Sequence, residues 1–412
     1  MVYSLTMLRA LLIGLILAGT CAAVQAQTIA IRAGRLIDPE SGATSRNQVI
    51  LIEGGVIRAV GGSLSIPENA KFIDLSNATV LPGLFDMHTH LCLAVKAPRD
   101  AGKYYYTTLN DPDATRAIEG VVNAQTMLES GFTTVRDVGN EGNFACASVR
   151  RAIEKKMVPG PTMFTAGRII APYGGQFSLQ PDKTNLAEPE YFFADTRDEM
   201  VKAIRENIHY GATVIKIVVD DQRYIYSADD IRFMVDEAGR AGLKLAAHAW
   251  THRGAHNAAT AGVASIEHGF GMTDEDLEIA KKNNVVLVGT EYLGLTDAKE
   301  RPRWVDRLRR AHKIGVTMAY GTDAIDEVDG QTRGTLAISG IDPWIEAGIP
   351  SKVLLQAMTM NAARLLGVEK ERGAIRTGMA ADIIATASNP LEDPNALKKV
   401  VFVMKNGVAI KQ

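Results

Sequence analysis

Residues 211–248 read GATVIKIVVDDQRYIYSADDIRFMVDEAGRAGLKLAAH, and this stretch decides the fold. The apolar run behind its first glycine predicts a buried strand. Ser227 and Asp230 then form a capping box, and apolar residues follow with a helical period as far as Ala238. Gly242 ends this helix, because glycine readily adopts the left-handed conformation at a helix C-terminus, and a second apolar run follows. The stretch therefore predicts one strand–helix–strand unit.

The same order recurs along the middle of the chain. A glycine separates a helical pattern from an apolar run at five places, and the expected strands are 132–135, 213–219, 243–247, 263–266 and 316–319. Helices that alternate with buried strands are typical of a parallel α/β fold. Residues 81–375 have the length of eight such units. The sequence thus predicts a (β/α)8 TIM barrel over 81–375.

The two ends of the chain have a different pattern. Short apolar runs separated by turn residues predict strands at 28–33, 49–53, 56–60, 72–75, 382–385, 400–405 and 408–411. Asn406-Gly407 between the last two is a strong hairpin signal. Since strands at opposite chain ends often pair, we expect one small β-sandwich domain built from 27–80 and 376–412.

Residues 1–26 are typical of a secretory signal peptide. Arg9 precedes a short apolar run, which ends in small residues before a cut expected near Gln27. The run is shorter than the roughly 20 residues that span a bilayer. A lipoprotein cut at Cys21 and an uncleaved anchor are the alternatives. We expect an exported protein, periplasmic or secreted, with no membrane association after cleavage.

Composition narrows the function classes. The 412 residues carry a formal net charge of −2, with 46% hydrophobic and 22% charged residues, which excludes a disordered chain. No basic stripe suggests a nucleic-acid partner. After cleavage two cysteines remain, Cys92 and Cys146, and we expect two separate buried residues rather than a bridge. A homo-oligomer is left open.

Polar residues lie at the carboxyl ends of several expected strands, directly after the apolar residues. Asp137, Lys216, His248, His268 and Asp323 each follow or close an expected strand. In a barrel the carboxyl ends of the strands meet at one face, where catalytic sites are found. The fold alone therefore gathers these five side chains into one site.

The sequence PGLFDMHTH at 82–90 opens the expected barrel. On a strand, residues i and i+2 point to the same side, so His88 and His90 present two imidazoles together. Imidazole nitrogens suit Zn²⁺ and similar ions. His248 and His268 add two imidazoles, and Asp323 adds a carboxylate.

Lys216 has two readings. An ammonium group cannot bind a cation, but a lysine carboxylated by carbon dioxide would be an anionic oxygen ligand able to bridge two metals. Alternatively, Lys216 forms an interior ion pair with a strand-end acid such as Asp137, since a buried charge needs a partner.

The ordered set His88, His90, Lys216, His248, His268 and Asp323 resembles the amidohydrolase superfamily, in the subset whose two metals are bridged by a carboxylated lysine. The flanking sequences IEHG at 266–269, GTDA at 321–324, MNAARLLG at 360–367 and GAIRTGMAAD at 373–382 agree with it. The resemblance covers nearly the whole chain after residue 26. It is nearest to the imidazolonepropionase-like branch, which includes prolidases, carboxypeptidases and ochratoxin-type amide hydrolases.

The resemblance implies a metal-dependent hydrolase of amide bonds with two divalent ions, zinc being the expected metal. It assigns His88 and His90, with Asp323, to one ion, and His248 and His268 to the other. Lys216, as N6-carboxylysine, would bridge them. Asp323 would be the catalytic residue that takes the proton of the attacking water and passes it to the leaving amine.

The sequence departs from these relatives near the expected substrate site. Gln176 stands where several peptidase-like relatives have the histidine of Gly-Gly-His, and 220–226 lacks a Gly-Gly loop that ochratoxin-type relatives share. The residues expected to bind the substrate are Gln176, Arg223, Tyr224, Tyr226 and Trp250, with Arg168 nearby. The expected substrate is a dipeptide or an N-acyl amino acid with a free carboxylate. A hydrolase of cyclic amides, lactones or esters is the alternative, and a non-catalytic binding protein the remote one.

His252 and His256 form a rival set, because they follow His248 at spacings of four residues. On one helix the three would share a face. His248, however, belongs to an expected strand, and we expect Gly254 to interrupt any helix. His252 and His256 are therefore predicted to be pocket-rim or surface residues.

Overall fold

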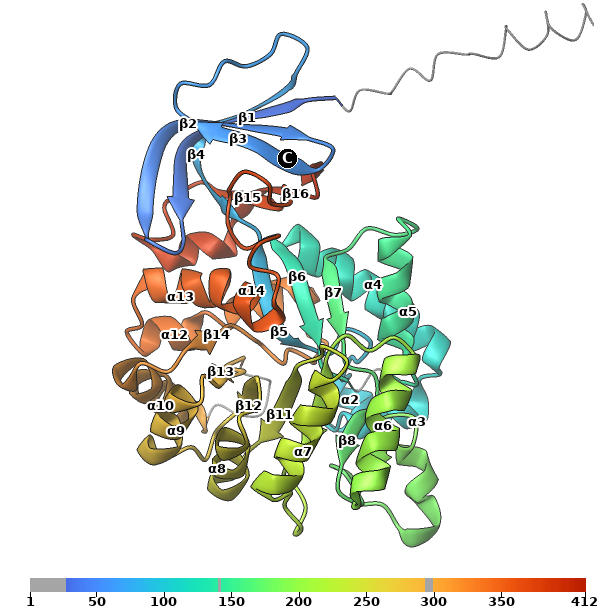
Figure 1. Cartoon of the computed structure of the whole chain (residues 1–412). Coiled ribbons are helices and arrows are strands. Elements are labelled where there is room, and N and C mark those ends of the chain that lie inside the picture. Colours follow the sequence, from blue (N-terminus) through green and yellow to red (C-terminus); the bar gives the residue numbers. More distant parts are fainter. Residues whose placement is uncertain (1–26, 140–141, 293–298) are drawn as a thin grey trace, which may run out of the picture.

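The computed structural model describes residues 27–139, 142–292 and 299–412. It contains a barrel surrounded by helices and a β domain packed against one end of it (Figure 1). The predicted α/β class, with a TIM barrel and a small β-sandwich, is confirmed. The predicted signal peptide at 1–26 lies outside the described residues.

Parallel strands fill the eight positions of the barrel, with β7 and β8 sharing the third. They are β5 (Leu84–Thr89), β6 (Phe132–Asp137), β7 (Thr162–Thr165), β8 (Ile169–Ala171), β10 (Ile215–Val218), β11 (Leu245–Ala249), β12 (Ser265–His268), β13 (Val286–Val288) and β14 (Met318–Ala319). The amide of Met87 donates to the carbonyl of Tyr320, and the amide of Asp323 donates to that of His88. These bonds join the first strand to the last and close the barrel.

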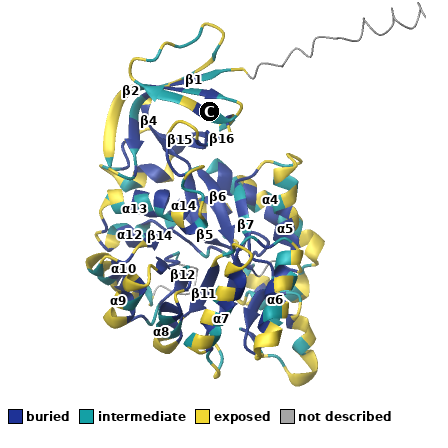
Figure 2. Ribbon diagram, in the orientation of Figure 1, coloured by how far each residue is buried: buried dark blue, intermediate teal, exposed yellow. Residues whose placement is uncertain are grey.

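Helices cover the outside of the barrel. They are α2 (Ala97–Asp100), α3 (Tyr105–Asn110), α4 (Asp113–Glu129), α5 (Ala145–Glu154), α6 (Arg197–His209), α7 (Ala228–Gly239), α8 (His252–Ala261), α9 (Asp274–Lys282), α10 (Arg301–Ile314), α11 (Arg333–Ser339), α12 (Asp342–Glu346), α13 (Ser351–Ala357) and α14 (Met360–Leu366). Two 3₁₀ turns, η1 (Pro181–Ala187) and η2 (Pro394–Lys398), and a short strand β9 (Tyr191–Phe193) complete this part. The strands are buried and the outer helix faces are exposed (Figure 2).

Several strands begin later than the sequence predicts. The residue after the helix-ending glycine still belongs to the helix cap: the amide of Val263 donates to Ala258, and that of Val316 donates to Ala311. These are the long bonds of the Schellman motif, in which the glycine is left-handed. Gly262 has φ +77° and Gly315 has φ +88°. The strands consequently start two residues further on, at Ser265 and Met318.

The start of α7 differs in detail from the predicted capping box. The amide of Asp230 donates to the Ser227 hydroxyl, as expected. The Ser227 hydroxyl in turn donates to the Asp230 carboxylate at 2.6 Å. The carboxylate is therefore bonded to the cap side chain, where a full box would bond it to the cap amide.

Both chain ends form one seven-stranded sheet. Its strands are β1 (Ile29–Asp38), β2 (Ala43–Glu53), β3 (Val56–Gly61), β4 (Lys71–Pro82), β15 (Ile383–Thr386), β16 (Val400–Lys405) and β17 (Val408–Lys411), in the order β17-β16-β15-β4-β1-β2-β3. The sheet curves around the core of this domain. The amide of Ile57 donates to the Met379 carbonyl, and the amide of Ala381 donates to the Gly55 carbonyl, so β3 is joined to the segment that precedes β15. β4 runs almost directly into β5, so this domain carries the first barrel strand and its histidines.

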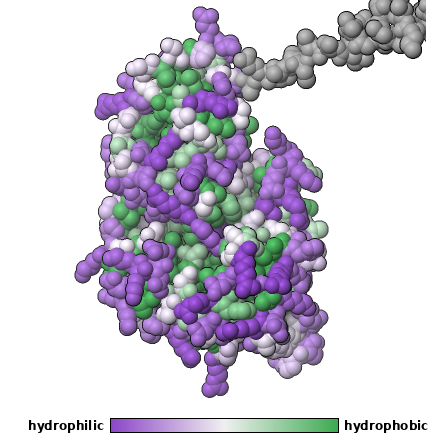
Figure 3. Space-filling view, viewed as in Figure 1, coloured by the Kyte–Doolittle hydropathy of each residue, from purple (hydrophilic) through white to green (hydrophobic). Residues whose placement is uncertain are grey.

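The surface of the described residues carries both hydrophilic and hydrophobic side chains. Figure 3 shows hydrophilic residues spread over the visible face with hydrophobic ones scattered among them. In the described part of the chain, no helix combines the length and the apolar character needed to cross a bilayer. Cys92 and Cys146 are buried and no disulfide joins them, as expected.

Candidate metal centre

All six expected metal-binding side chains line one cavity at the carboxyl ends of the barrel strands. Its volume is about 640 Å³. The six side chains are His88, His90, Lys216, His248, His268 and Asp323. Residues that are far apart in the sequence therefore share one site, which is where a barrel places its chemistry.

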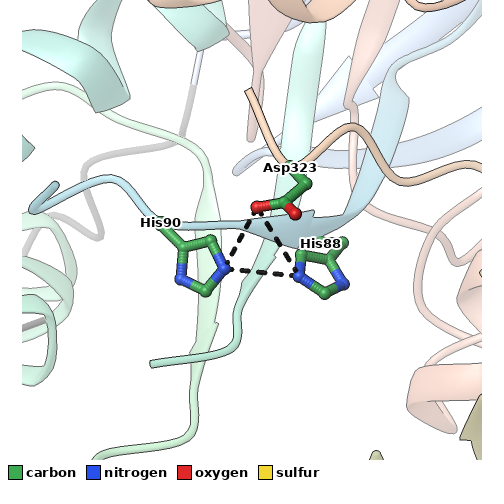
Figure 4. A group of neighbouring side chains, drawn as sticks. All are labelled: His88, His90 and Asp323. Atoms are coloured by element: carbon green, nitrogen blue, oxygen red, sulfur yellow. Dashed lines mark hydrogen bonds and ion pairs between the residues drawn. The ribbon is translucent and has the colours of Figure 1, made fainter. Parts of the chain in front are cut away.

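Three of the six form a tight group (Figure 4). The Nε2 atoms of His88 and His90, on β5, are 3.3 Å apart. Oδ1 of Asp323, on the loop after β14, lies 3.3 Å from Nε2 of His90 and 3.8 Å from Nε2 of His88. Two nitrogens and one oxygen thus face a common point, as a single cation requires.

The other nitrogen of each imidazole is held by the protein. Nδ1 of His88 lies 2.8 Å from the Glu267 carboxylate, and Nδ1 of His90 lies 2.6 Å from the carbonyl oxygen of Gly139. Arg136 donates to the same glutamate at 2.7 Å. Acceptors at Nδ1 fix the orientation of the rings and leave Nε2 as the nitrogen that can bind a metal.

Burial controls the charge of this group. Burial and the nearby Lys216 lower the pKa of His88 to about 3, so its ring is neutral, as a metal ligand must be. Burial alone would raise the pKa of Glu267, but Arg136 and His88 outweigh it and hold that pKa well below its usual range. The glutamate is therefore an anion, able to accept the Nδ1 proton.

The remaining two histidines lie beside this group. The ring of His268 is 4.9 Å from that of His88 and 4.5 Å from that of His248, centroid to centroid. Nδ1 of His268 lies 2.8 Å from the Thr290 hydroxyl, and Nε2 of His248 lies 2.9 Å from Oδ2 of Asp221. The four imidazoles thus form a continuous row along the cavity floor.

Lys216 is deeper than the sequence suggests. It is the second residue of β10, paired with Ala246, so it lies below the carboxyl end where we expected it. Its side chain is 2% exposed, and burial lowers its pKa to about 8. Among the described residues no carboxylate forms an ion pair with it. Asp137 instead accepts a hydrogen bond from the Leu91 amide at 2.6 Å. The alternative prediction, an ion pair between Lys216 and Asp137, is therefore not observed.

Asp323 lies on a strained loop. Its φ is +58°, a left-handed conformation that residues with side chains rarely adopt. Burial alone would raise its pKa, but His88 and His90 outweigh it and lower that pKa to about 2. The side chain is an anion among imidazoles, with 30% of its surface exposed to the cavity.

The donor set fits divalent ions. Imidazoles and carboxylates are the ligands that zinc and related ions take in proteins. The buried Lys216 amine has no carboxylate partner among the described residues, which leaves it open to modification. A second group of close ligand atoms, Asp220, Asp221 and His248, lies next to the first. The six cavity side chains would hold two ions more readily than one, with Asp220 and Asp221 as acidic neighbours of His248.

Only part of the expected substrate site lies at the cavity. Gln176 and Trp250 line it. Tyr226 does not, because it is fully buried and its hydroxyl donates to the Ala194 carbonyl at 2.6 Å. Arg223 and Tyr224 are exposed on the loop after β10 and do not line the cavity. The expectation that these three bind the substrate is therefore corrected.

Arg168 also lies outside the cavity lining. Its guanidinium donates to the Asn143 side chain and stacks over the rings of Phe144 and Phe192. These contacts hold the arginine against the protein. It joins the residues that sequence reasoning assigned to the substrate and the structure places elsewhere.

The structure adds Phe270 and Trp304 to Trp250, the aromatic residue that the sequence suggested for the cavity wall. Trp250 is stacked on the ring of His248, and Phe270 lies 5.3 Å from Trp250 and 4.9 Å from Trp304. All three line the cavity, and Arg303 on α10 lies at the same wall. Phe270 lies on a loop and Trp304 on helix α10, so no local pattern marks these two residues.

His252 and His256 are surface residues, as expected, but for a different reason. Gly254 does not interrupt the helix: it lies in the first turn of α8, where a Cβ would come within 2.2 Å of Asp220. Both histidines lie on this helix and point Nδ1 at the Asp276 carboxylate, at 2.7 and 2.9 Å. His248 is on β11, so the three do not share a face.

Comparison with known proteins agrees with this geometry. The model of the amidohydrolase family matches residues 79–410. An ochratoxinase from Aspergillus niger is 26% identical over 94% of this chain and 87% of its own length. An imidazolonepropionase from Kosmotoga olearia is 25% identical over 88% of this chain and 90% of its own length.

Solved structures show the same likeness. The crystal structure of a Xaa-Pro dipeptidase with methionine bound in its active site superimposes with a TM-score of 0.85. It shares 30% sequence identity, and the match covers 94% of this chain and all of the other. The similarity thus extends over the barrel and the β domain together.

Proposed function

The chain belongs to the amidohydrolase family, and from this premise we propose that it cleaves the amide bond of dipeptides or N-acyl amino acids with a free carboxylate. The family and its hydrolase relatives make it a metal-dependent hydrolase acting on carbon–nitrogen bonds. One observation carries the proposal: four imidazoles, a carboxylate and a lysine without a carboxylate partner meet in one cavity. The dipeptidase likeness supports the substrate class.

The ligands divide into two sets. His88 and His90, with Asp323, would hold one ion, and His248 and His268 the other. Divalent ions there, with zinc the expected metal, would supply Lewis acidity, which activates water and polarises the substrate carbonyl. The ring nitrogens held by Glu267 and by other acceptors keep the rings aimed at the cavity.

Lys216 would join the two sets as N6-carboxylysine. Its amine nitrogen adds to the carbon of carbon dioxide and releases one proton, which gives an anionic oxygen donor at the end of the side chain. The buried position of Lys216 supports this step, since burial lowers the pKa of its amine to about 8 and so favours the neutral nitrogen that reacts.

Asp323 would move the proton. Its carboxylate lies among the ligand imidazoles, 3.3 Å from Nε2 of His90, and is an anion. It would accept the proton of the attacking water and pass it to the nitrogen of the leaving amine. An amine is a poor leaving group until it is protonated, so a proton donor at this point is required.

The cavity wall bears on the substrate. Trp250, Phe270 and Trp304 offer an apolar surface beside His248, which suits an apolar side chain. Among the described residues that line the cavity, Arg303 is the arginine that could bind the carboxylate of a substrate. It also forms an ion pair with Glu300 at 2.8 Å. We therefore propose Arg303, in place of Arg223 and Arg168, as the arginine that binds the substrate carboxylate.

Paired substrates test the proposal: one N-acyl amino acid as the free acid and as its C-terminal amide, with zinc-loaded protein. A charged hydrogen bond to a carboxylate is worth about 1.5–3 kcal/mol, so the amide should lose roughly 10- to 100-fold in kcat/KM. Equal cleavage of both would overturn the free-carboxylate substrate. Cleavage of cyclic amides, lactones or esters alone would favour the alternative hydrolase.

We also propose that the protein is exported. The support is the character of residues 1–26, with a basic start, a short apolar run and small residues before Gln27. N-terminal sequencing of protein from the periplasm or medium of a bacterial host should begin near Gln27. A chain that keeps Met1 and stays inside the cell would contradict it.

A further inference from the structure

We propose that Asp221 is a positioning residue that holds the His248 imidazole through Nε2 and thereby sets the affinity of the second metal ion. The inference rests on the proposed function, since it assumes that His248 binds a metal. It concerns a residue that the family resemblance did not single out.

The argument starts from the other three histidines of the cavity. Each has its Nδ1 beside an acceptor of the protein: Glu267 for His88, the carbonyl of Gly139 for His90, and Thr290 for His268. In each ring Nε2 is left for an ion. The protein therefore orients every one of these rings from the side away from the ligand nitrogen.

His248 has the opposite arrangement. Its Nε2 is the nitrogen beside an acid: it forms an ion-pair contact of 2.9 Å with Oδ2 of Asp221, without the geometry of a hydrogen bond. Nδ1 is then the nitrogen left for an ion. His248 and His268, whose ring centroids are 4.5 Å apart, would together hold the second ion.

Asp221 is itself held in place. Its Oδ2 accepts the Gln176 amide at 2.7 Å, and Oε1 of Gln176 accepts the Tyr191 hydroxyl at 2.6 Å. This chain of contacts runs from the cavity wall to His248.

The backbone of Asp221 is strained. Its φ is +81°, in the region that favours glycine, and such a conformation costs about 1–3 kcal/mol where a side chain is present. Strained backbones of this kind are held by the surrounding structure and are frequent at functional sites. Here the side chain contacts His248 and Gln176, which gives it a role in the site.

The neighbouring Asp220 provides a contrast. It is fully buried, and its carboxylate accepts the amides of Trp250 and Thr251 and the Thr251 hydroxyl. Its nearest oxygen is 3.8 Å from Nε2 of His248. Asp220 therefore holds the loop after β11, and it serves as the matched structural control.

The test uses full-length protein loaded with zinc, with each ion's affinity measured by chelator competition. Asp221→Gly removes the carboxylate and relieves the strain, and Asp221→Asn keeps the shape without the charge. Loss of a group that orients a metal-binding histidine weakens the metal by roughly 10- to 100-fold. We expect this loss for one ion only, larger in Asp221→Gly than in Asp221→Asn, with the other ion unchanged.

A second measurement separates positioning from stability. Metal-free Asp221→Gly should melt no lower than the metal-free wild type, because the strained φ suits glycine. Asp220→Asn should melt lower. The inference is overturned if both ions keep wild-type affinity in Asp221→Gly, or if both weaken together. A wild type that binds no second ion would instead overturn the proposed function.

Discussion

Single residues around the cavity hold backbone conformations that side chains disfavour. His268, Thr290 and Asp323 have φ values of +66°, +54° and +58°. Each follows or ends a barrel strand, where the chain turns away from the sheet. The surrounding hydrogen bonds maintain these conformations, at a cost of about 1–3 kcal/mol each. The result is a set of side chains aimed into the cavity, so the chemistry is most sensitive to changes at this scale.

The first prediction concerns Lys216. If Lys216 is carboxylated as proposed, Lys216→Ala should lose the bound metals and nearly all amide hydrolysis, because the bridging carboxylate would be missing. Short carboxylic acids should restore part of both, since a small acid can occupy the space the side chain leaves. Metal analysis and kinetics with and without added acetate are the measurements. Full metal content and wild-type turnover in Lys216→Ala would show that the lysine is only a structural residue.

The second prediction concerns Asp323. Asp323→Asn has nearly the same shape but cannot accept a proton. Turnover should fall roughly 10²- to 10⁴-fold, the usual effect of a positioned general acid–base group. Circular dichroism on the same preparation should remain that of the wild type. Near-normal turnover would mean that another group transfers the proton.

At the scale of elements, helices α8 and α9 are tied together by one buried acid. Asp276 lies in the first turn of α9 and accepts the Thr273 amide, which caps that helix. It also faces Nδ1 of His252 and of His256 on α8. Although burial alone would raise the pKa of Asp276, these bonds together lower it.

This network gives a third prediction, on stability against pH. A carboxylate whose pKa is lowered on folding stabilises the protein above the ordinary aspartate value of about 3.9, and the effect disappears as the pH falls through the lower, folded value. Asp276→Asn should cost about 1–3 kcal/mol at pH 7, and the difference from wild type should shrink below about pH 4.

Urea unfolding of the metal-free proteins at several pH values measures this difference. The exposed neighbour Glu275 supplies the control, and Glu275→Gln should change the free energy of unfolding little at any pH. A gap between Asp276→Asn and wild type that is the same at pH 7 and pH 3 would contradict the prediction.

At the scale of the whole molecule, metal bound at the proposed site would tie the barrel together. Its ligands come from β5, β10, β11, β12 and the loop after β14, so they span most of the barrel. A site formed only in the folded state stabilises that state when metal binds. The β domain contributes indirectly, since β4 leads straight into the strand that carries His88 and His90.

The fourth prediction is therefore that two metal ions bind per chain and raise the melting temperature. Six ligand side chains are too many for one tetrahedral zinc. Elemental analysis of zinc-loaded protein should approach two equivalents, and removal of metal by a chelator should lower the melting temperature. Fully active protein with one equivalent would contradict the binuclear site.

The sequence alone determined the fold class and pointed to the six side chains that share the cavity. Alternating helices and apolar runs marked the barrel, and residues at strand ends converge because parallel strands share one edge. Periodicity and strand-end position are local properties, which a sequence carries directly. The same reasoning placed the strands too early at Gly262 and Gly315, because a helix cap uses residues that read as strand.

Only the tertiary structure decided the surroundings of those ligands. It buried Tyr226 away from the cavity, and it brought Phe270 and Trp304 to the cavity wall. It also set Asp221 beside His248 with a left-handed backbone. These contacts join loops from different strands, and their geometry depends on how the whole barrel packs. No local pattern encodes such distances, so the wall of the site and the supports of its histidines emerge only when the chain is folded.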